Sequence, residues 1–441
     1  MNVERRGSIK QLEPSSQLSE AQEEGGGKAK PFNIDKWRLV EAYRRVKANA
    51  GSAGVDRQSL EDFEKDLKNN LYKLWNRMSS GSYMPPLVKG VEIPKKSGGT
   101  RLLGVPAVSD RIAQMAARLE FEAQVEPHFL PDSYGYRPKK SARQAIDVTR
   151  KRCWDQDWVL EFDIKGLFDN IDHDLLMKAV EKHTDNPWVR LYIRRWLKAP
   201  MQLESGELVD RDKGTPQGGV ISPVLANLFL HYVFDAWLTK HYPRVKWCRY
   251  ADDGLVHCES EAQARFLLEA LRQRFKECGL ELHPEKTKIV YCKDGRRTGD
   301  YPQTSFDFLG YTFRRRSGRD RRTGQMFLGF MPAASATSMK AMRQKIRKMR
   351  IRSHTEISLE EIAARINPVL WGWLEYHGAF YRSEMYRLVR YVNQTLVRWA
   401  MRKFKHLRGK KTRAMQVLER VAKLRPYLFA HWKQGMLGAF A

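Results

Sequence analysis

Two adjacent carboxylates, Asp252 and Asp253, lie between two strand-like runs in residues 247–258, WCRYADDGLVHC. An Asp-Gly pair between such runs is a strong short-range signal for a β-hairpin, so we expect the turn at Asp253-Gly254. Two carboxylates at a hairpin tip repel each other unless a cation lies between them. The alternative is a solvated surface turn, because Asp is common in turns.

A third carboxylate, Asp163, ends a second predicted strand over residues 158–164, whose side chains alternate between an apolar and a mixed face. An ionised carboxylate at the end of a buried strand is costly unless a metal ion or a base compensates it. Together with Asp252 and Asp253 it matches the needs of a two-metal site. There, two Mg²⁺ ions roughly 4 Å apart activate a 3′-hydroxyl and stabilise the departing pyrophosphate.

The net charge indicates what kind of partner the chain binds. The chain of 441 residues carries 79 Lys and Arg against 51 Asp and Glu, a formal charge of +28, which favours a polyanion. Most of this net charge lies in two segments: residues 314–352 carry +12 and residues 396–425 carry +10. An anionic membrane surface is the alternative. No apolar run approaches the roughly 20 residues of a spanning helix, and no secretory signal is evident, so we expect no membrane partner and a cytoplasmic location.

Composition divides the chain into five regions. Residues 1–30 are rich in Glu, Gln, Ser and Gly and predict a disordered tail. Residues 31–90 carry apolar stripes at helical spacing, with Asn33 and Ser59 as expected N-caps. Residues 91–313 hold the predicted strands. In 314–395 and 396–441, basic helices with interleaved aromatics suit a groove that tracks a nucleic-acid backbone and stacks bases. The alternative is a helix bundle with an aromatic core and a solvated charged face.

Two further segments carry ligand-binding chemistry. Residues 91–106 predict a hairpin with Lys95 and Arg101 near its tip, and these two cations suit a triphosphate. An exposed basic turn is the alternative. Residues 214–219 form a Gly-rich turn before an apolar helix expected over 221–237, which allows close approach of a ligand to the backbone.

In this order, the motifs resemble those of a reverse transcriptase, most closely the group II intron reverse transcriptase/maturase family, from about Phe32 to Trp432. The resemblance implies an α+β right-hand polymerase: fingers and palm with an antiparallel sheet over 91–313, preceded by an N-terminal extension with part of the fingers over 31–90. An α-helical thumb or maturase domain over 314–395 and a basic nucleic-acid-binding segment over 396–441 follow. The sequence lacks the Cys-pair endonuclease domain of many relatives, which implies the lineage without it.

The resemblance also implies roles for single residues. Tyr250-Ala251-Asp252-Asp253 resembles the catalytic hairpin, and Asp163 the first catalytic aspartate, with the Ile164 carbonyl as a further metal ligand. We expect Asp252 to be a surer ligand than Asp253, whose side chain lies on the other side of the strand. The nucleotide would be bound by the fingertip pair Lys95 and Arg101, the steric gate Phe168, Gln217 of the Pro-Gln-Gly motif, and Lys286, with Lys288 as the alternative motif lysine.

The primer grip would be Phe308, Leu309, Gly310 and Tyr311. RNA-binding candidates in the basic helices are Arg343, Lys345, Arg347, Lys348, Arg402, Lys403 and Lys405.

The implied function is RNA-directed DNA synthesis with two Mg²⁺ ions, combined with maturase activity. The implied partners are a group II intron RNA, an RNA template with a DNA primer, target DNA and deoxynucleoside triphosphates, in a nucleoid-associated ribonucleoprotein. One alternative is a non-enzymatic RNA-binding splicing factor, against which the intact Asp163, Asp252 and Asp253 argue. Another is a reverse transcriptase of a phage-defence or CRISPR locus, which the long thumb resemblance disfavours.

Overall fold

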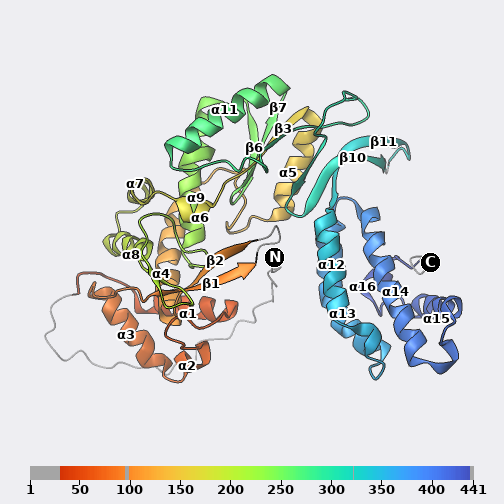
Figure 1. Cartoon of the computed structure of the whole chain (residues 1–441). Helices are drawn as coiled ribbons and strands as arrows, with labels where there is room; N and C mark the ends of the chain where they lie inside the picture. Colours follow the sequence, from red (N-terminus) through yellow and green to blue (C-terminus); the bar gives the residue numbers. More distant parts are fainter. Residues whose placement is uncertain (1–29, 95–98, 321, 438–441) are drawn as a thin grey trace. The chain divides into compact units, whose positions relative to one another are not determined.

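The computed structural model describes residues 30–94, 99–320 and 322–437. They fall into two compact units (Figure 1). The larger unit comprises residues 30–306 and 315–330, and the smaller one residues 307–314 and 331–437. No helix among the described residues is long and apolar enough to cross a membrane.

The larger unit begins with three helices, α1 (Lys36–Asn49), α2 (Leu60–Glu64) and α3 (Leu67–Ser79). The expected cap at Asn33 is wrong, because Asp35 accepts the hydrogen bond from the Trp37 N–H and caps α1. Ser59 does open α2, in a capping box with Asp62. The helix expected after it is interrupted at Lys65–Asp66, so α2 and α3 are separate elements.

A four-stranded sheet of order β2-β1-β4-β5 follows. Its strands are β1 (Val88–Pro94), β2 (Thr100–Val105), β4 (Met201–Gln202) and β5 (Leu208–Val209). The predicted hairpin is confirmed, since β1 and β2 pair antiparallel with Ile93 opposite Arg101. Lys95 lies outside the described residues.

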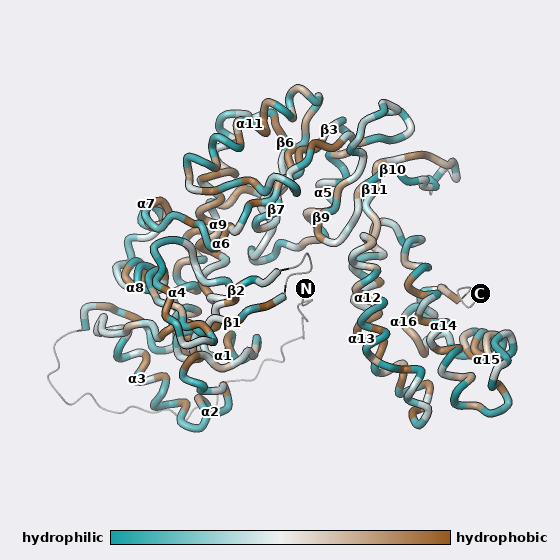
Figure 2. Tube along the Cα trace, in the orientation of Figure 1, coloured by the Kyte–Doolittle hydropathy of each residue, from teal (hydrophilic) through white to brown (hydrophobic). Residues whose placement is uncertain are grey.

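A second four-stranded sheet carries the predicted carboxylates. Its order is β6-β7-β3-β8, with β6 (Lys246–Tyr250), β7 (Asp253–Cys258), β3 (Trp158–Asp163) and β8 (Lys288–Tyr291), and all three pairings are antiparallel. β3 contains a hydrophobic stretch (Figure 2). On one face, the Phe162 ring contacts Phe275 of α11 (Glu261–Glu277). On the other face, Cys248 contacts α5 (Ala142–Asp155).

The remaining helices of this unit pack into the same core. They are α4 (Val108–Val125), α6 (Leu167–Asn170), α7 (His173–His183), α8 (Pro187–Leu197), α9 (Ser222–Leu230) and α10 (Ala236–His241). The long apolar helix expected over 221–237 is present, but it is interrupted by a π-helical turn, η2 (His231–Asp235), between α9 and α10. Propensity and hydrophobic spacing do not reveal such a turn, because its residues remain helical.

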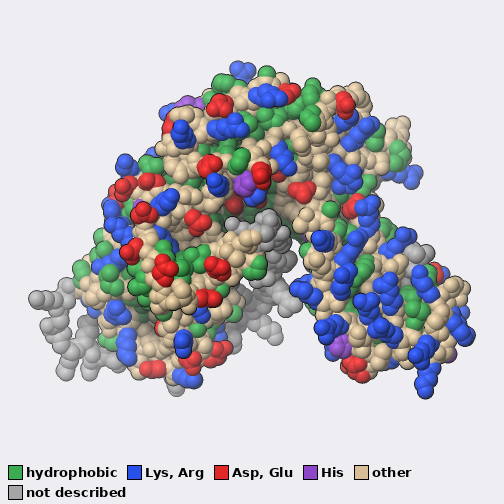
Figure 3. Space-filling view, viewed as in Figure 1, with side chains coloured by type: hydrophobic (Ala, Val, Ile, Leu, Met, Phe, Trp, Pro, Cys, Tyr) green, Lys and Arg blue, Asp and Glu red, His purple; other side chains and the backbone are tan. Residues whose placement is uncertain are grey.

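The strands β9 (Ser305–Phe308), β10 (Tyr311–Arg319) and β11 (Met326–Ala334) form a sheet of order β11-β10-β9. The helices of the smaller unit are α12 (Ala336–Lys348), α13 (Leu359–His377), α14 (Tyr386–Lys403), α15 (Lys411–Leu424) and α16 (Ala430–Lys433). They share one core that includes Ile362, Leu396 and Trp432. The expected division at 395/396 therefore falls inside α14, and the five-region division stays a prediction. Lys and Arg side chains gather over this unit (Figure 3).

Candidate active site

Asp163 and Asp253 are direct cross-strand partners. They are the last pair in the register of β3 with β7. The Asp163 carbonyl accepts a hydrogen bond of 2.8 Å from the His283 N–H, so the peptide groups of Asp163 point away from β7. This makes Asp163 and Asp253 a non-hydrogen-bonded pair, the type in which opposite side chains lie closest. The sheet therefore brings two carboxylates together from positions far apart in the chain.

The hairpin between β6 and β7 is confirmed, but its turn is not where the Asp-Gly signal predicts. Tyr250 pairs with Asp253, so the two turn residues are Ala251 and Asp252. Ala251 has a φ of 55°, a left-handed conformation that costs a non-glycine residue about 1–2 kcal/mol. Gly254 lies within β7, where an added Cβ would fall 2.0 Å from the Phe162 ring. Gly254 thus serves packing and not the turn.

Lys286 places a cation against Asp163. Its Nζ donates a hydrogen bond of 2.8 Å to Asp163 Oδ2. Lys288 lies opposite Glu161 on β8, farther along the sheet. Of the two candidate lysines, the structure therefore places Lys286 at the carboxylates.

Burial and the negative charges nearby make Asp252 and Asp253 hard to ionise. Burial, together with the charges of Asp252 and Asp163, raises the pKa of Asp253 to about 7. Burial raises the pKa of Asp252, and Asp163 adds to the effect. The hydrogen bond to Asp163 raises the pKa of Lys286. The site thus holds three acids beside the ammonium of Lys286, an arrangement that a bound cation would relieve.

The donor atoms suit a hard divalent ion, since carboxylate and carbonyl oxygens are the ligands that Mg²⁺ prefers. Consecutive carbonyls alternate between the two edges of a strand, so the Ile164 carbonyl points opposite to that of Asp163, toward the edge at which β7 pairs. Within the described residues, no group of three or more His, Cys, Asp or Glu side chains is already arranged as a metal site. Lys286 instead holds one Asp163 oxygen. The oxygen donors and the repulsion between the acids fit a divalent cation.

The other expected nucleotide-binding residues lie on neighbouring elements of the larger unit. Arg101 is exposed on β2, Phe168 is half-buried on α6, and Gln217 is half-buried in the Gly-rich turn. This turn is fixed at both sides: the Thr215 N–H donates to the Phe168 carbonyl at 2.7 Å, and the Gly104 N–H donates to the Gln217 carbonyl at 2.7 Å. The backbone of the Gly-rich turn therefore bridges the expected steric gate and the β1–β2 hairpin.

Sequence reasoning missed two residues that lie near these segments. Gln114 of α4 accepts hydrogen bonds from the Val220 and Ile221 N–H groups at 2.8 and 3.3 Å, and so anchors the end of the Gly-rich turn. Tyr136 is 49% exposed and has a φ of 58°, an uncommon conformation for a bulky residue. Burial, and then the charge of Asp252, raises the pKa of its hydroxyl. The sequence offers one local signal for Tyr136, an aromatic residue directly after Gly135.

The expected primer grip belongs to the smaller unit. Leu309 and Gly310 have φ values of 50° and 82°, so the chain reverses sharply there. The Leu309 carbonyl accepts from the Tyr376 hydroxyl at 2.9 Å, and the Gly310 carbonyl from the Ser335 N–H at 3.0 Å. Phe308, Leu309 and Tyr311 are buried, so three of the four expected grip residues keep their side chains away from solvent.

The expected RNA-binding residues differ in solvent exposure. Lys345, Arg347, Lys348, Arg402 and Lys405 are exposed, whereas Arg343 and Lys403 are half-buried. The Lys403 ammonium donates to the carbonyls of Thr355 at 3.0 Å and Ile357 at 2.7 Å. Lys403 therefore has a structural use in holding the loop before α13.

Two family models match the chain: reverse transcriptase (RNA-dependent DNA polymerase) over residues 93–313, and group II intron, maturase-specific domain, over residues 339–418. Protein YkfC of Escherichia coli is 31% identical over 321 residues, which cover 64% of this chain and 81% of YkfC. The group II intron-encoded protein LtrA of Lactococcus lactis is 27% identical over 351 residues, 65% of this chain and 56% of LtrA. A telomerase structure from Candida albicans aligns over 86% of this chain and 69% of its own, with a TM-score of 0.44 and 12% identity.

The antiparallel sheet with its acidic hairpin, followed by a helical unit, defines a right-hand polymerase with palm, fingers and thumb. The chain belongs to the reverse transcriptases, and its maturase-specific domain places it with the group II intron-encoded proteins. It is thus an RNA-directed DNA polymerase of a family that uses divalent metal ions and binds intron RNA.

Proposed function

We propose that this protein assists the splicing of a group II intron RNA and copies that RNA into DNA at a DNA target, with two Mg²⁺ ions at Asp163, Asp252 and Asp253. The observation that carries the proposal is the direct register of Asp163 with Asp253, beside the turn residue Asp252. A protein that only binds RNA has no use for three acids at one sheet end facing a polyanion. The non-enzymatic alternative is therefore not favoured.

The carboxylates and the Ile164 carbonyl would hold the metal ions. When bound, the ions activate the primer 3′-hydroxyl and stabilise the charge on the departing pyrophosphate. Lys286 holds a proton at Nζ beside Asp163, where it is available to the pyrophosphate as it leaves. The raised pKa of Lys286 keeps Nζ protonated before the pyrophosphate leaves.

The remaining residues select and orient the substrates. Arg101, with Lys95 of the same hairpin, would bind the triphosphate. The Phe168 ring would exclude a ribose 2′-hydroxyl, and Gln217 would line the nucleotide and template pocket.

The helical unit would hold the nucleic acids. Its primer grip, 308–311, would position the primer end, and the exposed cations of α12 and of residues 402–405 would bind the intron RNA backbone. The regions proposed are fingers and extension over 31–90, fingers and palm over 91–313, thumb over 314–395 and a basic segment over 396–441. In the cell the protein would act as a ribonucleoprotein in the nucleoid.

Two assays test this function. Purified protein should extend a DNA primer on an RNA template with Mg²⁺ and deoxynucleoside triphosphates. It should also promote exon joining in a precursor RNA that contains the co-purifying intron, identified by sequencing. Splicing without DNA synthesis would contradict the polymerase assignment, and synthesis without bound intron RNA would contradict the maturase assignment.

A further inference from the structure

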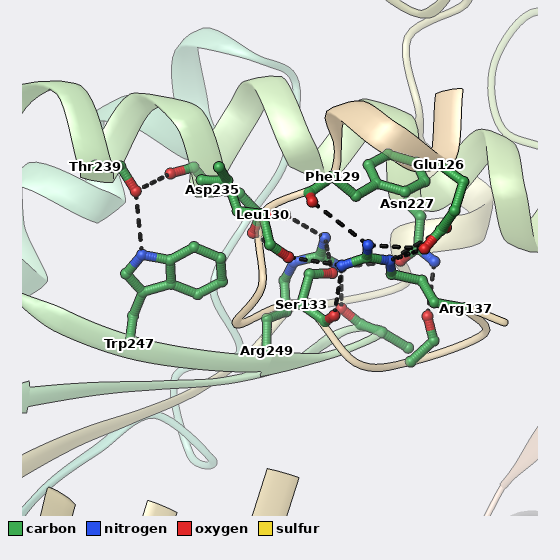
Figure 4. Close-up of polar contacts among 12 residues, drawn as sticks. Glu126, Phe129, Leu130, Ser133, Arg137, Asn227, Asp235, Thr239, Trp247 and Arg249 are labelled. Carbon is green, nitrogen blue, oxygen red and sulfur yellow. Dashed lines mark hydrogen bonds and ion pairs between the residues drawn. The ribbon is translucent and has the colours of Figure 1, made fainter. Parts of the chain in front are cut away.

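A fully buried arginine lies next to the catalytic hairpin. The side chains of Arg249, on β6, and of Asp235, at the end of η2, are both 0% exposed. The guanidinium donates from Nε to Asp235 Oδ1 at 2.7 Å and from Nη2 to Asp235 Oδ2 at 2.5 Å, a bidentate pair (Figure 4). Arginine is almost never fully buried unless it is paired, so this position needs an explanation.

The other donors of Arg249 reach three different segments. Nη1 donates to Asn227 Oδ1 and to the Ala251 carbonyl, both at 3.1 Å, and Nη2 donates to Ser133 Oγ at 2.9 Å. With the two bonds to Asp235, all five N–H donors of the guanidinium are used. One side chain thus links a long helix, a loop and the hairpin turn.

The bond to Ala251 lies at the strained point of that turn. A left-handed alanine persists only where its surroundings fix it. The second constraint comes from Gly135, where an added Cβ would fall 2.4 Å from the Ala251 nitrogen. Asn227 holds Gly135 in turn, since its Nδ2 donates to the Gly135 carbonyl at 2.7 Å. The same network therefore fixes the backbone of the turn from two sides. Asp252 directly follows Ala251, so its position depends on that backbone.

The π-helical turn gives Asp235 its direction. The Ala236 N–H donates to the His231 carbonyl, five residues back. One extra residue rotates the following side chains by about 100° around the helix axis. Arg274 of α11 holds the turn open, because its Nη2 and Nε donate to the carbonyls of Tyr232 and Val233, both at 3.2 Å. The π-helical turn thus orients the Asp235 carboxylate toward the Arg249 guanidinium.

We propose that Arg249 and Asp235 are positioning residues for nucleotidyl transfer, which set the location of Asp252 by holding the Ala251 carbonyl. This inference rests on the proposed function of Asp252 as a metal ligand. Stability alone is a poor reason for the pair, because apolar residues of similar volume replace buried ion pairs at little cost or with a gain. The pair is needed for its hydrogen bonds to the turn.

The test separates stability from positioning with the double variant Arg249→Met/Asp235→Leu. We expect thermal unfolding and intron RNA affinity close to wild type, a single-turnover primer-extension rate at least tenfold lower, and a higher Mg²⁺ concentration for half-maximal rate. Arg297→Met/Asp294→Leu is the matched control, because this ion pair is 10% and 16% exposed and its bonds lie outside the hairpin. It should keep the wild-type rate and Mg²⁺ dependence.

A double variant with wild-type rate and Mg²⁺ dependence would overturn the inference. If that variant does not fold, the single variant Arg249→Lys tests the inference instead. Lysine keeps the positive charge but cannot reach all the hydrogen-bond partners of a guanidinium. Arg249→Lys should show the same loss of rate and the same shift in Mg²⁺ dependence, and wild-type behaviour would overturn the inference equally. Failure of the proposed function is distinguishable, because wild-type protein would then make no DNA in the same assay.

Discussion

The Nζ of Lys286 lies 2.8 Å from Oδ2 of Asp163, although 123 positions separate the two residues in the chain. This contact brings the loop before β8 to the acidic end of β3. Of the two lysines that the sequence leaves open, the contact favours Lys286, because Lys288 lies opposite Glu161 instead.

Replacing Lys286 by Ala should lower the rate of primer extension by at least tenfold, since loss of a positioned proton donor typically costs 10²–10⁴-fold. The exposed Lys288→Ala is the matched control and should stay within about twofold of wild type. Pre-steady-state rates with saturating nucleotide measure both. Equal rates for the two variants would contradict the role of Lys286.

Replacing Phe168 by Ala should admit ribonucleotides. The half-buried ring is the expected barrier to a 2′-hydroxyl, so its removal should raise the ratio of ribonucleotide to deoxynucleotide incorporation by at least tenfold. The ratio is measured on one RNA template with each nucleotide in turn, so a general loss of activity cancels. An unchanged ratio would mean that the ring only packs against the core.

Acid should destabilise the larger unit through His257. Burial lowers the pKa of this histidine to about 3, and neither ring nitrogen has a hydrogen-bond partner among the described residues. The unfolded chain binds the proton more readily, so the stability contribution is complete above about pH 6.5 and is lost as the pH falls toward 3.

The expected loss of unfolding free energy at pH 5.5, relative to pH 7.5, is about 1 kcal/mol from this residue. His257→Leu should remove that part of the pH dependence, as measured by urea unfolding at both values. The exposed His406→Gln serves as control. A pH dependence that His257→Leu leaves intact would show that other groups cause the acid sensitivity.

The exposed cations of α12 should contribute to RNA affinity. The triple variant Lys345→Gln/Arg347→Gln/Lys348→Gln should bind intron RNA more weakly. The plot of log affinity against log salt concentration should become less steep, by about one for each phosphate that the variant no longer neutralises. Lys240→Gln/Lys276→Gln removes exposed cations from α10 and α11 as a control. Equal salt slopes for the two variants would place the RNA elsewhere.

Local patterns in the sequence predicted the strands and most helices, and the family motifs predicted which carboxylates meet. They failed where long-range packing decides. The Asp-Gly signal placed the turn two residues late, because Gly254 is required by the Phe162 ring and Ala251 takes the left-handed position. Ala251 adopts it with help from Arg249, whose partner Asp235 depends on a π-helical turn. No local sequence pattern predicts this series of long-range contacts.

The ranking of the two hairpin acids stays a prediction. Alternation suggested Asp252 as the surer ligand, whereas the register gives Asp253 a direct place beside Asp163. A larger loss of activity in Asp253→Ala than in Asp252→Ala would reverse the ranking.

The acidic hairpin is the proposed centre of DNA synthesis. The most direct measurement is primer extension on an RNA template by Asp252→Ala, with thermal unfolding and intron RNA binding measured on the same preparation. We predict wild-type folding and RNA binding, with DNA synthesis reduced to background. Synthesis at the wild-type rate by a folded Asp252→Ala protein would contradict this role of the hairpin.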